Sequence, residues 1–252
     1  MLINEMEYLT PSFAVCGDWH GNIYYPKLVF SNSIFRNIDV FLHLGDLSPA
    51  YKTEEYFNKL HDYCVVYNKY FLFIDGNHEN YNFIEALPLQ ADGSRKFSDR
   101  IYYLPRGFLW EWYGKKLLAC GGAVSVNMQS LVRNVEYFEQ ETISLHDVNE
   151  CVKHGKVDLM FTHDRPLDTK MYIAMPPPPS WIPKNMLYLS QRNQRVLQEI
   201  VNIVKPEALY HGHYHDCYEG YKELPDGGVT KIYGLDMENS PISYNTKIVE
   251  LL

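Results

Sequence analysis

The chain has 252 residues, of which 46% are hydrophobic, and this is enough apolar sequence for one domain with a large core. Its formal net charge is -8 and its Lys and Arg residues are scattered, which argues against a protein that binds a long nucleic acid. The N-terminus has no basic region before an apolar block, and no apolar stretch approaches the length of a membrane span. We therefore expect a cytoplasmic protein that forms a single domain over residues 1–252 and does not bind membranes.

Short apolar runs, each about the length of a fully buried strand, alternate along the chain with longer segments of helical spacing. The runs predict strands within residues 12–18, 39–46, 69–77, 115–122, 157–164, 207–213, 230–236 and 246–252. The segments of helical spacing are Tyr25–Arg36, Glu54–Tyr67, Glu141–Lys153 and Leu189–Val204. Strands that alternate with helices predict an α/β layered fold.

One proline-rich segment and the cysteines need a separate reading. The segment Met175–Pro183 contains Pro176–Pro179, which donate no backbone hydrogen bonds, and such sequence is typical of a stiff polyproline-like spacer. The five cysteines include no CxxC pair, and most of them lie in apolar surroundings. We expect buried free thiols in a reducing compartment.

Five of the first six apolar runs end on side chains that are acidic or able to bind a metal. Ligands of α/β sheets bind in the crevice outside the carboxyl ends of the strands, so residues at these ends can converge although they are far apart in sequence. The residues are Asp18, His20, Asp46, Asn77, His78, His163, His213 and His215.

With His78 set aside, two carboxylates, one amide and four imidazoles provide seven oxygen and nitrogen ligands and no thiolate. This set is too large for one tetrahedral zinc and suits two divalent ions with positions left for water. Paired ions roughly 3.5–4 Å apart share a carboxylate and a hydroxide and stabilise both sides of a displacement at phosphorus. Gly45, Gly76 and Gly212 each precede a predicted ligand and let the backbone turn and approach an ion. The sequence predicts a dinuclear centre for manganese, iron or zinc that acts on a phosphoester.

The motif order DxH, GD, GNHE, H and GHxH over residues 12–216 resembles the calcineurin-like metallophosphoesterase superfamily. The middle of the chain is similar to the compact prokaryotic and phage-encoded phosphodiesterases of this superfamily. The resemblance implies a two-sheet β-sandwich flanked by helices. It also implies that Asp46 bridges two ions, and that His78 acts as a general acid or stabilises the transition state. One ion would be held by Asp18, His20, Asp46 and His215, and the other by Asp46, Asn77, His163 and His213.

Several residues near the motifs are not predicted ligands. His43 and His211 precede predicted ligands within strands and are expected in the core, as is Trp19. Arg133 and Arg165 are candidates to bind phosphate oxygens, although surface ion pairs explain them equally well.

Three functions compete for this pattern. Protein phosphatases of the superfamily carry arginines beside the second and third motifs, which bind a phosphomonoester dianion, whereas this chain reads GDLSPAY and IDGNHE there. A phosphodiesterase acting on small nucleotide-like or cyclic nucleotide substrates is therefore favoured over a phosphomonoesterase or protein phosphatase. A non-catalytic scaffold that binds a partner is disfavoured because all the motif residues are present.

Overall fold

The computed structural model describes residues 2–9, 11–48, 50–172 and 179–252. Within these residues the strands form two sheets, one of six strands and one of seven. The order in the first sheet is β13 (Thr246–Glu250), β1 (Ser12–Cys16), β2 (Val40–His43), β3 (Tyr70–Phe73), β5 (Ile101–Tyr103) and β4 (Arg95–Ser98). The order in the second is β6 (Leu109–Trp112), β7 (Lys115–Cys120), β8 (Leu159–Thr162), β10 (Ala208–His211), β12 (Val229–Gly234), β11 (Tyr218–Glu223) and β9 (Lys170–Met171).

Neighbouring strands in the middle of each sheet are parallel, and antiparallel strands border them. Strands β1, β2, β3 and β5 run in one direction, with β13 and β4 antiparallel at the edges. Strands β7, β8, β10 and β12 are likewise parallel, while β6 and β11 are antiparallel to them. The carboxyl ends of the central strands of one sheet therefore share an edge.

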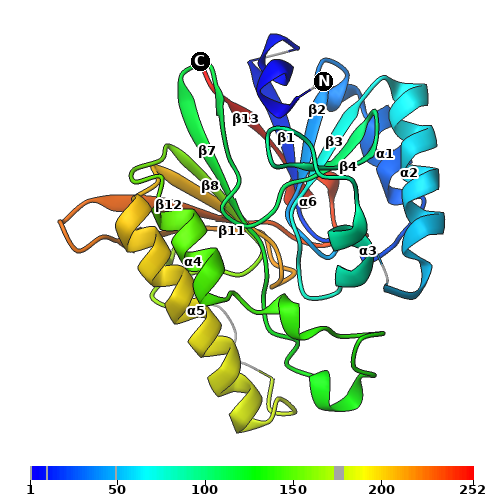
Figure 1. Cartoon of the computed structure of the whole chain (residues 1–252). Coiled ribbons are helices and arrows are strands. Elements are labelled where there is room, and N and C mark those ends of the chain that lie inside the picture. The colour runs from blue at the N-terminus through cyan, green and yellow to red at the C-terminus, as the bar shows by residue number, and fades with distance from the viewer. Residues whose placement is uncertain (1, 10, 49, 173–178) are drawn as a thin grey trace.

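Helices cover the outer faces of both sheets. Figure 1 shows α1 and α2 on one side of the molecule and α4 and α5 on the other, with the sheets between them. The α-helices are α1 (Tyr25–Ser31), α2 (Thr53–Tyr67), α3 (Tyr81–Ala86), α4 (Leu145–Val152), α5 (Lys184–Val204) and α6 (Ile242–Asn245). Short 3-10 helices are η1 (Ile3–Tyr8), η2 (Ser33–Phe35), η3 (Ala50–Lys52), η4 (Met128–Ser130) and η5 (Glu139–Glu141).

The packing of β1 shows why the central strands read as continuous apolar runs. Phe13 and Val15 belong to the core between the two sheets, whereas Ala14 and Cys16 belong to the core under α1 and α2. A third core lies between the second sheet and helices α4 and α5. A strand that is buried on both faces has no polar face, so its sequence does not alternate. The predicted two-sheet sandwich flanked by helices is confirmed.

The predicted strands correspond to β1, β2, β3, β7, β8, β10, β12 and β13. Two predicted helix starts were wrong. Helix α4 begins at Leu145 and not at Glu141, because Ser144 caps it by accepting a hydrogen bond from the backbone of Asp147. Helix α5 begins at Lys184, five residues before the predicted start, with Pro183 at its N-cap.

The cysteine and proline predictions had different outcomes. Four of the five cysteines are buried and free, as expected, but Cys217 is exposed. Of the proline-rich segment, residues 175–178 lie outside the described residues, so the predicted role of Pro176–Pro179 as a stiff spacer is not tested. Across the described ranges, no helix is long and apolar enough to cross a membrane.

Candidate metal centre

The candidate centre lies where the carboxyl ends of strands from both sheets meet. Asp18 follows β1 and Asp46 follows β2, while His163 follows β8 and His213 follows β10. The two sheets are joined here directly, because the Nδ1 atom of His163 lies 2.7 Å from the backbone oxygen of Leu44. The strand ends thus bring together residues that are far apart in the sequence, as in the hydrogen bond of 3.1 Å that joins the His213 backbone to the Asp18 carboxylate across 195 positions.

Six of the seven predicted ligands form two groups, and in each group the potential ligand atoms all lie within 4.8 Å of one another. The first group is Asp18, His20 and His215, and the second is Asp46, His163 and His213. Asn77, the seventh, lies beside the second group, with its Oδ1 atom 3.2 Å from Nε2 of His163. The structure therefore brings all seven residues together, three in the first group and four in or beside the second.

The Asp46 carboxylate lies between the two groups. Its Oδ2 atom is 3.8 Å from Nε2 of His20, and its Oδ1 atom is 3.3 Å from Nε2 of His163. The backbone N–H groups of Asn77 and His78 each donate a hydrogen bond of 2.9 Å to Oδ1. Each oxygen of the Asp46 carboxylate faces a different group, which is an arrangement compatible with a bridging ligand.

The donor set fits divalent cations. Asp18 and Asp46 are 0% and 2% exposed, and within the described part of the chain no Lys or Arg forms an ion pair with either. The Nε2 atom of His20 lies 3.9 Å from Asp18 and 3.8 Å from Asp46, beyond hydrogen-bond length. Their partners are backbone N–H groups and the imidazoles of His163 and His215, and a cation lying among two such buried carboxylates would stabilise them further.

Burial and the charges of neighbouring groups shift the pKa values of three imidazoles at the centre. Burial opposes a charge on His163, but the Asp46 carboxylate outweighs it and raises the pKa of His163 to about 10. Burial likewise opposes a charge on His20, but the hydrogen bond with Glu238 and the nearby carboxylates raise its pKa to about 9. Burial and the charge on His163 lower the pKa of His213 to about 4. Because a metal binds neutral imidazole, ion binding must displace protons from His163 and His20.

The backbone at the centre is strained. His20, Asp46, His213 and His215 have φ angles of 40°, 55°, 68° and 52°, in the left-handed region that residues other than glycine rarely adopt. Such conformations cost roughly 1–3 kcal/mol each and concentrate at functional sites.

The predicted glycine positions have two different causes. Gly45 has a φ of 98°, which a residue with a side chain would adopt only under strain. A Cβ atom at Gly76 would overlap the Asp46 carboxylate, and one at Gly212 would overlap the Asp18 carboxylate. These two glycines are needed because the backbone passes directly against the candidate ligands.

Two acidic residues hold parts of the centre in place, and sequence reasoning missed one of them, Glu238. An oxygen of Glu238, in the loop after β12, lies 2.8 Å from Nδ1 of His20 and so fixes the orientation of that ring. Glu79 is 1% exposed and accepts hydrogen bonds from the backbones of Leu47 and Gly76, which join the loops after β2 and β3. In the sequence, the role of Glu238 is indicated only by its acidic side chain and its position shortly after a predicted strand.

His78 lies at the centre without joining either group. It is half-buried, and its ring centroid is 6.1 Å from that of His20. Among the described residues, neither nitrogen of its ring has a hydrogen-bond partner. The imidazole is therefore available to a molecule bound at the centre.

Among the described residues, the side chains of the other candidates form no ion pair with Asp18 or Asp46. Arg133 forms an exposed ion pair of 2.6 Å with Glu139. The Arg165 guanidinium stacks 4.1 Å from the centroid of the Tyr214 ring. Trp19 and His43 are fully buried and pack against each other in the core, as predicted.

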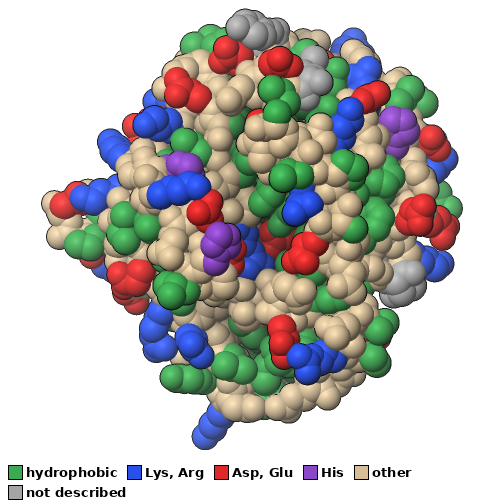
Figure 2. Space-filling model, in the orientation of Figure 1, with side chains coloured by type: hydrophobic (Ala, Val, Ile, Leu, Met, Phe, Trp, Pro, Cys, Tyr) green, Lys and Arg blue, Asp and Glu red, His purple; other side chains and the backbone are tan. Residues whose placement is uncertain are grey.

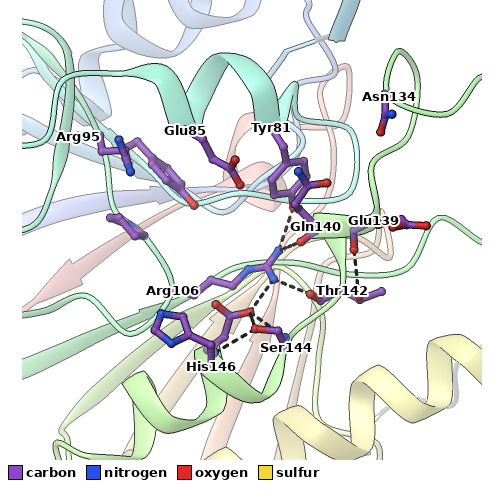
Figure 3. Close-up of a pocket in the computed structure, with 13 residues that line it drawn as sticks. Tyr81, Glu85, Arg95, Arg106, Asn134, Glu139, Gln140, Thr142, Ser144 and His146 are labelled. Carbon is purple, nitrogen blue, oxygen red and sulfur yellow. Dashed lines mark hydrogen bonds and ion pairs between the residues drawn. The ribbon is translucent and has the colours of Figure 1, made fainter.

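A separate cavity of about 880 Å³ lies beside the centre, and none of the candidate ligands lines it. Figure 3 shows Arg106 among its lining residues, with hydrogen bonds to the chain around Gln140 and Thr142. The Arg106 guanidinium also pairs with the buried carboxylate of Asp75, with 2.6 Å between the closest atoms. Through Arg106, the cavity wall is thus bonded to Asp75, which lies two residues before Asn77 in the sequence.

Comparison with known proteins agrees with this geometry. A crystal structure of a dimetal phosphatase from Danio rerio is similar with a TM-score of 0.54 and 12% identity, and the match covers 95% of this chain and 92% of that one. A second solved structure has a TM-score of 0.53 and 11% identity, and the match covers 96% of this chain and 99% of the other. These likenesses concern the fold alone, and no curated protein sequence matches significantly. The model of the calcineurin-like phosphoesterase family matches residues 11–217, and the chain therefore belongs to that family.

Proposed function

We propose that this protein is a dinuclear metal-dependent phosphodiesterase that hydrolyses small nucleotide-like substrates, with cyclic nucleotides as the favoured class. Its family supports a metal-dependent phosphoesterase. The observation that carries the choice of a diester is the lack of an arginine beside Asp46 and Asn77, in the sequences GDLSPAY and IDGNHE.

The proposed ligands follow the two groups. Asp18, His20 and His215 would hold one ion with Asp46, whose other oxygen faces the second group. Manganese is the metal that we propose, with iron and zinc as alternatives, because the donors are oxygen and nitrogen without thiolate. Two such ions would lower the pKa of a water molecule and stabilise charge on the phosphoryl group. The second ion would be held by Asp46, Asn77, His163 and His213.

The charges near the centre favour a monoanionic diester over a dianionic monoester. Arg106 is the nearest arginine to the third motif, and its guanidinium is occupied by Asp75 and Asp147. Arg133 is likewise paired with Glu139 on the surface. A terminal phosphate dianion gains a large part of its binding from charge-assisted bonds to arginine, each worth about 1.5–3 kcal/mol. A diester loses less when these contacts are missing.

The surface is consistent with a small substrate. On the face that Figure 2 shows, Lys and Arg side chains lie scattered among Asp and Glu side chains. A protein that binds a long nucleic acid presents a continuous basic stripe to the phosphates, and the net charge of -8 is unfavourable for that.

The contacts of His78 support a role as general acid. Its backbone N–H is bound by the Asp46 carboxylate, so the residue is fixed at the centre, while its imidazole stays free of protein partners within the described residues. We propose that this imidazole donates a proton to the leaving oxygen, a role worth about 10²–10⁴ in rate.

The substrate class is tested by comparing bis-p-nitrophenyl phosphate with p-nitrophenyl phosphate on manganese-loaded protein of known metal content. We expect two ions per chain, loss of activity with a chelator, and faster turnover of the diester. A preference of tenfold or more for the monoester would support the phosphomonoesterase alternative. No turnover of either ester by protein that holds two ions would support the non-catalytic scaffold.

The role of His78 is tested by His78→Ala on an alkyl diester and an aryl diester. A nitrophenolate leaves without a proton, so the loss in kcat/KM should be about 10²–10⁴ for the alkyl ester and much smaller for the aryl ester. His146→Ala, at an exposed histidine outside both groups, is the matched control. Equal losses on the two esters would rule out proton donation, and depleted metal would mean that His78 is a ligand.

A further inference from the structure

The side-chain amide of Asn77 has two different neighbours. Its Oδ1 atom lies 3.2 Å from Nε2 of His163, on the side of the candidate metal centre. Its Nδ2 atom donates a hydrogen bond of 3.1 Å to the hydroxyl of Ser125 on the opposite side. Because the oxygen can bind a cation and the NH₂ group cannot, the orientation of this amide decides whether Asn77 serves as a ligand.

The orientation is imposed by a chain of hydrogen bonds that ends at Glu141. The hydroxyl of Ser125 donates to one oxygen of Glu141 at 2.8 Å, and the backbone N–H of Ser125 donates to the other at 2.8 Å. Ser125 and Glu141 are both 1% exposed, so water does not compete at either residue. Burial raises the pKa of Glu141 to about 7, and in its ionised form Glu141 only accepts hydrogen bonds, so the single proton of the Ser125 hydroxyl then points to Glu141. The hydroxyl can then only accept from Asn77, which requires the NH₂ group on that side.

Glu141 is itself held in place by the network around Arg106. The Arg106 guanidinium donates to the backbone oxygen of Glu141 at 3.1 Å and pairs with Asp75, two residues before Asn77. Figure 3 shows Arg106 directed at this stretch of chain, next to Gln140 and Thr142. The contacts from Asn77 through Ser125, Glu141 and Arg106 back to Asp75 form a closed ring, so the segment that carries Ser125 and Glu141 is fixed relative to β3.

We propose that Ser125 and Glu141 are positioning residues that hold the Asn77 amide with its oxygen towards the second metal position. The proposal deepens the proposed function, because it rests on Asn77 as a metal ligand. It predicts an effect on one ion only. Ser125 and Glu141 contact neither Asp18 nor the other residues of the first group in the hydrogen bonds of the described chain.

In the first test, metal-free protein is titrated with Mn²⁺, and calorimetry measures the affinity for each ion. Ser125→Ala removes the acceptor for the Asn77 NH₂ group, and Glu141→Gln places an NH₂ group opposite the hydroxyl, whose proton then turns towards Asn77. We expect both variants to bind one of the two ions about 10–100-fold more weakly, as is usual when a residue that orients a ligand is lost. Ser48→Ala is the matched control, since Ser48 is 1% exposed and its hydroxyl has no partner in the described structure.

A second variant separates orientation from general structural support. An aspartate at position 77 has two equivalent oxygens and needs no orienting partner. In an Asn77→Asp background, Ser125→Ala should therefore cause no further loss of Mn²⁺ affinity, whereas a purely structural role would cause the same loss in both backgrounds. Thermal melting of every metal-free variant checks that the fold is retained.

Three outcomes would overturn the proposal: wild-type Mn²⁺ affinity in Ser125→Ala and Glu141→Gln, equal weakening of both ions, or equal loss in the Asn77→Asp background. Failure of the proposed function gives a different result. A wild-type chain that binds two ions but hydrolyses no phosphoester would refute the enzyme, while the selective loss of one ion in Ser125→Ala would still support the positioning role.

Discussion

Replacement of Arg106 by methionine should destabilise the fold strongly, because it leaves the Asp75 carboxylate buried and uncompensated. Asp75 is 0% exposed and Arg106 is 7% exposed at its side chain. The guanidinium donates to Asp75 through two nitrogens, at 2.9 and 2.6 Å, and also reaches Asp147 at 3.1 Å. Methionine keeps the aliphatic volume but none of these bonds. The hydroxyls of Tyr81 and Tyr103 remain as donors to Asp75, but they carry no charge.

The magnitude follows from the burial of the pair. Removal of one partner of a buried ion pair costs about 3–5 kcal/mol. For a chain of this size each kcal/mol lowers Tm by about 2–4 °C, so Arg106→Met should melt about 6–20 °C below the wild type. The free energy of unfolding is measured by urea denaturation followed by circular dichroism, and Tm is measured on the same samples.

Two further variants make this test specific. In the double variant Asp75→Asn with Arg106→Met, no buried charge remains, so the combined loss should be smaller than the sum of the single losses. Arg133→Met breaks the exposed pair with Glu139 and should cost at most about 1 kcal/mol. A loss below 1 kcal/mol in Arg106→Met, or additive losses in the double variant, would refute the reasoning.

Other substitutions test separate parts of the structure. Asp46→Ala should lower both metal content and activity more than Asn77→Ala, because Asp46 faces both groups; equal losses would remove its bridging role. Burial lowers the pKa of His43 from 6.5 to about 3, so the folded state keeps it neutral and stability should fall as the pH drops below about 6.5. In the His43→Leu variant this loss of unfolding free energy, about 2 kcal/mol at pH 5, should be absent. If the unfolding free energy differed between pH 7 and pH 5 by the same amount in the variant as in the wild type, the prediction would be contradicted. Lys69→Met should lower the unfolding free energy by about 2 kcal/mol in the same assay, because Nζ of the buried Lys69 donates to three backbone oxygens at 2.6–3.2 Å; no loss would contradict this.

The parts of the fold that could be predicted from the sequence are those with a strong local pattern. The central strands are buried on both faces and so appear as short apolar runs. Strands β4, β5, β6, β9 and β11 were missed. Strands β4, β6, β9 and β11 lie at or near sheet edges and carry partly or fully exposed residues, as in the alternating burial of β11, whereas β5 is buried but only three residues long. Exposed positions tolerate polar side chains, which hides the strand from a search for apolar runs.

The candidate ligands could be predicted for a related reason. Each follows a recognisable strand, and parallel strands deliver their ends to one place. Residues that orient those ligands have no such marker. Glu238 reaches His20 across 218 positions from a loop, and Glu141 reaches Ser125 across 16 positions from the short 3-10 helix η5. Their roles depend on how loops approach one another, which becomes visible only in the folded chain.

Backbone conformation at the centre shows why loops and candidate ligands must be considered together. The glycines in the motifs predicted sharp turns of the backbone. Asp46, which has a side chain, also adopts the left-handed conformation. It persists because other loops hold it. The Asp46 backbone oxygen accepts hydrogen bonds from the N–H groups of Trp19 and His20, at 3.1 and 2.9 Å, and its carboxylate accepts from Asn77 and His78.

These four hydrogen bonds join the loops after β1, β2 and β3 at one residue. A strained conformation that costs roughly 1–3 kcal/mol is retained when surrounding contacts determine it, and here the same contacts also place the carboxylate between the two groups of candidate ligands. A substitution at Asp46 therefore removes the hydrogen bonds that its carboxylate accepts from the Asn77 and His78 backbones, as well as a candidate ligand. Metal content and local loop order should change together at this position, whereas at His215, whose side chain is exposed and contacts Asp18 at 3.1 Å, only the ligand is lost.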